Sequence, residues 1–285
     1  MNKITLFILV ILFPVHINAQ NTDTINVKHL VLKSFRGYMS EKSPTILINY
    51  GFSKISLEDF NSDFAKPNLI ELRIGFSQKN HVYKNSVYSY LMGDFLLGNT
   101  TTSISNASVL DGLRTNTWRF GFNRSLGYGY SFGIFGITLN NENSFLWSKV
   151  QFLDEPKDSI DRHVTDLFNN AFRFGTSTEA SIQFNISSYA AVNAGYERAI
   201  VFRRHLLFKW ALSEAVELGA GYALDEFINE LQNRAPMIVP IINFVVKNAL
   251  SYGIYQLRQK KMYWPLKSEP PLSFDQFKAG LVFSF

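Results

Sequence analysis

Apolar and polar residues alternate along the middle of the chain with a period of two, the pattern of β-strands whose two faces meet different surroundings. In residues 68–77, Ile70 and Leu72 point to one face. Glu71 and Arg73 lie between them and point to the opposite face. Similar alternation, sharp in the first group and weaker in the second, predicts strands at 45–53, 116–123, 178–186 and 189–197, and at 87–97, 104–110, 128–139 and 144–153. We expect turns between them, including one at Asn140-Asn141.

The period changes to that of a helix from about Phe202. Residues 203–233 are rich in helix formers and lack turn residues, which favours a helix, although the alternation within 216–224 keeps a strand open as the alternative. Residues 236–258 carry a wide apolar face. A polar stripe opposite that face is made of Asn243, Lys247 and Ser251.

The N-terminus has the form of a cleaved secretory signal peptide. A short positive region at Lys3 precedes an apolar run over 4–15, and small residues end it at Ala19. The run is too short for a transmembrane anchor. We therefore expect residues 1–19 to be removed and residues 20–44 to form an N-terminal segment before the first strand.

The chain ends in an alternating strand whose last residue is aromatic. Its outward set is Phe277, Ala279, Leu281, Phe283 and Phe285. This ending resembles the C-terminal insertion signal of bacterial outer-membrane β-barrel proteins, and the Asn-, Phe- and Ile-rich style with an Ala-Gln junction resembles proteins of the Bacteroidota. The resemblance implies a Gram-negative envelope, location in the outer membrane and recognition by the barrel assembly machinery, with Phe277, Leu281, Phe283 and Phe285 as the insertion signal.

Composition agrees with a membrane barrel more than with a soluble β-sandwich, which also alternates. Aromatic residues make up 15% of the chain, with 26 Phe and 13 Tyr, and barrels need aromatic girdles. Cysteine is absent, which closes disulfide frameworks, cysteine metal sites and a lipoprotein anchor. The net charge of +5 is spread without a basic run, so no nucleic-acid partner is expected.

These patterns predict an all-β membrane barrel of about 8–10 antiparallel strands, with an α-helical insert before the last strand. The expected segments are strands over 45–202, a helical insert at 203–258, and a loop with the closing strand at 259–285. An insert in this position belongs to the extracellular side. We expect it to fill the lumen as a plug, with Lys247 facing wall residues such as Glu71 or Glu179. Packing on the membrane face or against a partner is the alternative.

Two groups of side chains are candidates for a site. The first would lie on the polar, lumen-facing side of the strands, as interior salt bridges or as a ligand path: Glu71, Arg73, Arg119, Glu179 and Glu197. The second would contact a lipid phosphate or a partner protein near the start of the insert: Arg203, Arg204, His205, Lys209 and Trp210. The charged stretch 154–166 lacks the ordered spacing of a calcium loop and predicts a solvated loop.

No nucleophile–base pair, metal-ligand spacing or phosphate-binding loop stands out, so we expect no catalytic residues, metal or cofactor. The function hypothesis is an outer-membrane barrel with a structural, assembly or partner-binding role, a filled lumen and contacts with outer-membrane lipids or an envelope protein. Two alternatives remain: a plugged transporter of a small or lipidic solute, and a lipid-modifying barrel enzyme.

Overall fold

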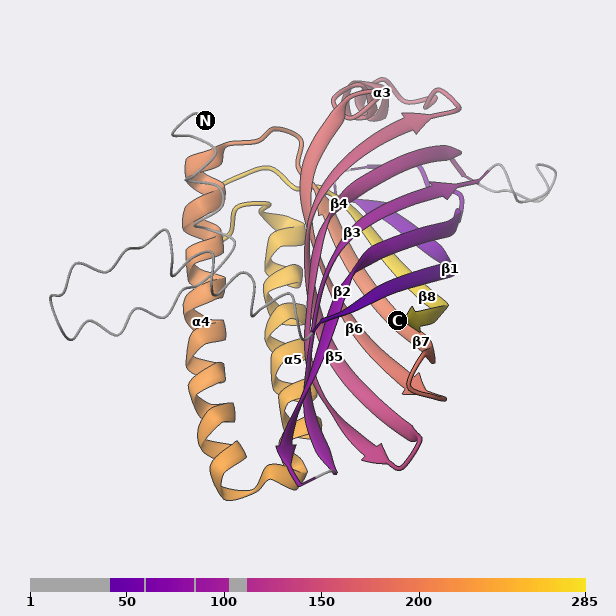
Figure 1. The fold of residues 1–285 in the computed structure, drawn as a ribbon. Helices are drawn as coiled ribbons and strands as arrows, with labels where there is room; N and C mark the ends of the chain where they lie inside the picture. The colour runs from indigo at the N-terminus through magenta and orange to yellow at the C-terminus, as the bar shows by residue number, and fades with distance from the viewer. Residues whose placement is uncertain (1–41, 59, 85, 103–111) are drawn as a thin grey trace, which may run out of the picture. The chain divides into compact units, whose positions relative to one another are not determined.

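The protein folds as a closed eight-stranded barrel (Figure 1). The computed structural model describes residues 42–58, 60–84, 86–102 and 112–285. Each strand pairs antiparallel with its sequence neighbours, and β1 pairs with β8 to close the sheet. The strands are β1 (Ser43–Leu57), β2 (Asn68–Tyr83), β3 (Val87–Thr101), β4 (Thr115–Phe132), β5 (Phe135–Phe152), β6 (Phe172–Asn185), β7 (Ala190–Val201) and β8 (Leu272–Ser284). The predicted fold class is confirmed, whereas the signal peptide and the strand predicted at 104–110 lie outside the described residues.

One predicted turn is wrong. Asn140 and Asn141 lie inside β5, which runs unbroken through them. The chain turns instead between β4 and β5, where Gly133 has a φ of 75°, a left-handed conformation that glycine adopts without strain. The prediction failed because a pair of asparagines is a common turn signal. In this strand the two side chains instead point to opposite faces of the barrel wall.

The two faces of the barrel wall differ in polarity as the alternation predicted. On β1, Thr45 and Asn49 point inward and are buried. Ile48 points outward and is 50% exposed. The same division holds on β2, where Glu71 is buried and Ile74 is exposed. A folded soluble protein would bury these apolar side chains, so the exterior of this barrel is suited to an apolar solvent.

The connections at the two ends of the barrel differ in length. Strands β2 and β3, β4 and β5, and β6 and β7 are joined by short turns at the end that also holds the C-terminus. The connections at the opposite end are long, as in outer-membrane barrels. One of them contains helix α3 (Ser159–Asp166), so the predicted solvated loop is partly helical.

Helix α3 helps to close this long-loop end. Val164 and Phe168 join an apolar cluster with inward residues of the strands, including Leu96 and Phe274. The buried Asp161 carboxylate accepts hydrogen bonds from the backbone N–H groups of Asn61 and Ser62, at 3.0 and 2.9 Å, and one from the Ser62 hydroxyl. The helix therefore fastens the connection between β1 and β2 over the barrel mouth.

The insert is a pair of antiparallel helices, α4 (Leu207–Arg234) and α5 (Val239–Lys260), joined through a single 3-10 turn, Pro236–Ile238. The helical prediction for 203–233 is therefore confirmed over the stricter bounds of α4. Helix α5 packs against β4, β5 and β6 (Figure 1). It does so from outside, because the Asn141 amide points away from the lumen and donates to Asn248 at 2.9 Å and to Ser251 at 3.2 Å.

The predicted helical plug is therefore wrong. The polar stripe of α5 does face polar wall residues, but they lie on the exterior and not at Glu71 or Glu179. Lys247 pairs with Asp225 of α4. The physical reason is room: the lumen of an eight-stranded barrel is just wide enough for its own side chains to fill.

Candidate functional site

The structure brings all five predicted lumen charges together in one buried network. Arg73 is ion-paired with three carboxylates: Glu71 at 2.7 Å, Glu142 at 2.7 Å and Glu179 at 2.6 Å. Arg119 pairs with Glu71 and with both oxygens of Glu197, at 3.0 and 2.9 Å. All of these side chains are buried. Buried charges require partners of this kind, so the network binds the wall strands to one another across the lumen.

Three members of this network were missed by the sequence prediction. Lys278 of β8 contacts Glu71, Glu179 and Glu197 at 2.7–3.0 Å. Glu142 also accepts from Ser125 at 2.7 Å, and Asp94 accepts from Asn123 at 3.0 Å. Glu142 was missed because the incorrect turn prediction at Asn140-Asn141 interrupted the strand that carries it. Lys278 could have been found, because it lies on the inward set of the final alternating strand.

Acids outnumber bases in this interior. The described residues place Glu71, Glu142, Glu179, Glu197 and Asp94 against Arg73, Arg119 and Lys278, that is five acids and three bases. Glu179 and Asp94 each keep one carboxylate oxygen without a hydrogen-bond partner among the described residues. Removing one of the three bases should therefore destabilise the network more than removing one of the five acids.

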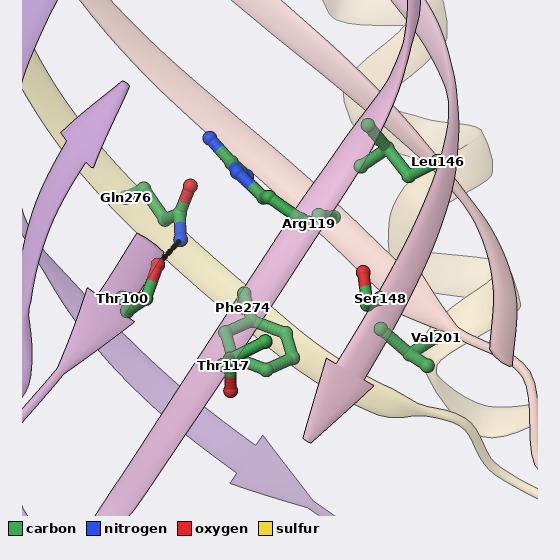
Figure 2. A pocket seen from close by; sticks show the side chains of 9 residues that line it. Thr100, Thr117, Arg119, Leu146, Ser148, Val201, Phe274 and Gln276 are labelled. Atoms are coloured by element: carbon green, nitrogen blue, oxygen red, sulfur yellow. Dashed lines mark hydrogen bonds between the residues drawn. The ribbon is translucent and has the colours of Figure 1, made fainter. Parts of the chain in front are cut away.

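Little free space remains beside the network. A cavity of about 10 Å³ is lined by residues that include Thr100, Arg119 and Gln276 (Figure 2). The side-chain amide of Gln276 donates a hydrogen bond to the Thr100 hydroxyl at 3.4 Å. A volume of this size holds about one water molecule. The apolar cluster under α3 fills the long-loop end beyond it. This interior is a packed core.

The exterior carries a continuous polar row, which the sequence analysis did not identify. Direct register partners on successive strands form it, and all of them point outward: Lys54 on β1, Asp275 on β8, Arg198 on β7, Thr178 on β6, Asn143 on β5 and Arg124 on β4. Charge on an apolar barrel exterior is costly near the middle of a membrane. A covering element is therefore needed wherever this row meets lipid.

Helix α5 supplies this cover over part of the row. The Arg198 guanidinium lies 3.6 Å from the centre of the Tyr252 ring and 5.4 Å from that of Tyr255, both on α5. It also lies 3.7 Å from Asp275. Asn141, beside the row on β5, is only 5% exposed under the helix. Helix α5 therefore covers this part of the polar row, with two tyrosine rings near Arg198 and polar side chains against Asn141.

The predicted cationic group at the start of the insert divides into two parts. His205 and Trp210 pack on the outer aromatic side chain of Phe174, with ring centres 4.6 and 5.5 Å away. Arg204 pairs with Glu269, and Lys209 donates to the carbonyl of Lys267 at 3.2 Å. Arg203 also has a partner within the protein. The group thus anchors the helices to the wall and to the following loop.

Three of the predicted insertion residues lie on the outward face of β8, and Phe285 follows its last residue. Phe277, Leu281, Phe283 and Phe285 are exposed, Phe285 to 70%. Phe277 also contacts Tyr196, with ring centres 4.5 Å apart. Their recognition by the assembly machinery stays a prediction.

The closed barrel, the apolar exterior and the ion-paired interior together define an outer-membrane-type β-barrel. No family model matches the sequence, and the search of curated proteins found no significant match. Solved barrels align along most of the chain, at very low identity. Neisserial surface protein A aligns over 85% of this chain and 97% of its own, at 8% identity and a TM-score of 0.37.

Two other solved barrels align to a similar extent. Ail, the attachment invasion locus protein of Yersinia pestis, aligns over 85% and 99% of the two chains, at 8% identity and a TM-score of 0.32. Outer membrane protein OprG from Pseudomonas aeruginosa aligns over 86% and 97%, at 10% identity and a TM-score of 0.26.

Proposed function

We propose that this protein is a non-enzymatic outer-membrane barrel with a structural or partner-binding role, exerted through its outer surface. The observation that carries the proposal is the ion-paired lumen, with a cavity of about 10 Å³ beside it. A path for a solute would require that network to open, and every ion pair broken there leaves a buried charge. A plugged transporter is disfavoured for a second reason: the helical insert lies outside the lumen and does not plug it.

The helical hairpin is the distinguishing feature of the exterior. Helix α4 is about 42 Å long and α5 about 33 Å, from the rise per residue, and a bilayer core is about 30 Å thick. Among the described helices, Pro236–Lys260 is long and apolar enough to cross a membrane, with a mean hydropathy of 1.4. The hairpin therefore has the dimensions to lie in the bilayer beside the barrel.

Several charged side chains of the hairpin are paired between its two helices. Arg258 pairs with Glu214 at 3.2 Å and with Glu217 at 2.8 Å. Lys247 pairs with Asp225. Charged side chains inside membrane segments are expected to pair in this manner. This cross-bracing holds α4 and α5 together and supports a hairpin that presents a second, helical surface in the plane of the membrane.

The test combines location, conductance and lipid composition. The full chain should fractionate with the outer membrane, shift its gel mobility on heating, and give no stepwise conductance in planar bilayers. Lipid A from a deletion strain should keep its mass profile. Stable channels would support a transporter, and loss of one acyl or phosphate group from lipid A would support an enzyme. Either result would overturn the proposal.

A further inference from the structure

The base of the helical hairpin, where the chain leaves β7 and returns to β8, carries an excess of cations. Residues 203–217 and 258–269 hold seven Lys and Arg against three Glu, a net charge of +4. The three acids are all ion-paired with arginines of the base. Four exposed lysines remain without a carboxylate partner in the described part of the chain: Lys209, Lys260, Lys261 and Lys267.

Contacts between the two ends of the hairpin hold these cations near one another. The Lys209 ammonium donates to the carbonyl of Lys267 at 3.2 Å. The N–H group of Met262, which directly follows Lys261, donates to the carbonyl of Glu269 at 3.1 Å. The two segments therefore form one unit. Such a group of ammonium charges attracts an anion that carries more than one negative charge.

Apolar side chains are exposed on α4 next to the cations. Lys209, Leu212 and Val216 follow one another at i, i+3 and i+7, so they share one side of the helix. Leu212 and Val216 are exposed, and Phe208 beside Lys209 is 80% exposed. From Lys209 this apolar surface continues along α4 toward the short-turn end. A charged head followed by an apolar path matches a lipid with an anionic headgroup.

The level of the base selects the leaflet. The base lies at the long-loop end of the barrel, because β7 ends at Val201 and β8 begins at Leu272. Aromatic rings lie beside it, with Phe174 5.5 Å from Trp210 and 5.4 Å from Trp147. Aromatic girdles mark the interfaces of membrane barrels, and the longer loops face outward. In the membrane orientation proposed above, the cations therefore lie at the level of the outer-leaflet headgroups.

We propose that the hairpin base binds the phosphate groups of an outer-leaflet glycolipid of the lipid A type. Lys209 and Lys267 contact a phosphate, and an acyl chain follows Leu212 and Val216 along α4. Several unpaired lysines match a lipid with two phosphates better than a phospholipid with one. This inference rests on the proposed outer-membrane location and adds a lipid ligand for the outer surface.

The test uses native mass spectrometry of the full chain released from phosphatidylcholine nanodiscs that contain equal amounts of bisphosphorylated lipid A and phosphatidylglycerol. The wild type should retain one lipid A molecule in preference to phosphatidylglycerol. Lys209→Gln/Lys267→Gln should weaken this retention roughly thirtyfold, about fivefold for each lysine close to an anionic lipid surface. The matched control is Lys66→Gln/Lys157→Gln, because these exposed lysines belong to other connections at the same end of the barrel.

A second sample with dephosphorylated lipid A tests the role of the phosphates. Selective retention of phosphorylated lipid A that falls in Lys209→Gln/Lys267→Gln and persists in the control variant supports the proposal. Equal retention of phosphatidylglycerol or dephosphorylated lipid A, equal retention by both double variants, or no retention by the wild type overturns it. Displacement of the lipid by inorganic phosphate also overturns it and would show a site for the free anion. Heat-modifiable mobility and membrane fractionation report separately on the barrel, so failure of lipid binding is distinguishable from failure of the proposed function.

Discussion

Replacing Arg73 with Met should destabilise the barrel far more than replacing its partner Glu179 with Gln. Arg73 donates to Glu71, Glu142 and Glu179 at 2.6–2.7 Å, and its side chain is 1% exposed. Met keeps much of the apolar volume and removes the charge. The substitution changes an interior of five acids and three bases into one of five and two. Breaking a buried pair by removing one partner costs about 3–5 kcal/mol.

Glu179→Gln changes the same interior to four acids and three bases, which is closer to neutrality. Gln keeps an oxygen that accepts from Arg73, and one Glu179 oxygen already lacks a hydrogen-bond partner among the described residues. The expected cost is about 1 kcal/mol, the scale of one altered hydrogen bond. The double variant Arg73→Met/Glu179→Gln should recover part of the loss, since it removes one of the acids left unpaired.

The assay is urea unfolding of the purified chain in phospholipid vesicles, followed by tryptophan fluorescence and by the heat-dependent gel shift. A loss of 3–5 kcal/mol shifts the folding equilibrium by roughly two to four powers of ten. Equal effects of the two single substitutions, or a loss below about 1 kcal/mol for Arg73→Met, would refute the reasoning from charge imbalance.

Three other predictions concern the surface and the loops. Replacing both Phe283 and Phe285 with Asp should block membrane assembly, because charge on the lipid face costs up to a few kcal/mol per residue; unchanged levels in isolated outer membranes would contradict this. Asp161→Ala should cost about 1–3 kcal/mol locally and expose the long-loop end to protease on intact cells, with no change in the gel shift. Hydrogen bonds from Arg114 hold the pKa of Asp154 below its usual value. The contact therefore stabilises the loop fully above about pH 3.9, the usual pKa of an Asp side chain. This stabilisation is lost as the pH falls through the lowered pKa. Protease sensitivity there should therefore stay constant from pH 7 to pH 5, and an increase within that range would count against the contact.

The strand architecture could be predicted because one physical rule controls it. Each wall residue faces either lipid-type surroundings or the packed lumen. The alternation at Ile70, Glu71 and Leu72 therefore shows which side chains point outward and which point inward. The same rule placed Glu71, Arg73, Arg119, Glu179 and Glu197 on one interior surface. It could not say which of them touch, because contact across the lumen depends on strand tilt and register.

The position of the helices could not be predicted for a different reason. An amphipathic helix shows that a polar stripe needs a polar partner, and both the lumen and the outer wall offered one. The polar outward residues Asn143, Thr178 and Arg198 belong to different strands, and only the observed pairing aligns them into a row. Without knowledge of that register, the sequence did not reveal a polar row on the exterior. The polar stripe of the helix was therefore assigned to the lumen.

The order of acids around the wall has a consequence for how the barrel closes. Glu142, Glu179 and Glu197 are direct partners on β5, β6 and β7, so three like charges stand side by side in the growing sheet. Their cations arrive from elsewhere: Arg73 from β2, Arg119 from β4 and Lys278 from β8. A partial sheet of the later strands repels itself, since adjacent like charges destabilise strand pairing. Pairing of β8 with β7 brings Lys278 to these acids, but only closure of the sheet, in which β8 pairs with β1, brings Arg73 of β2 across the lumen to Glu142 and Glu179. Barrel closure therefore completes the charge compensation of the three acids.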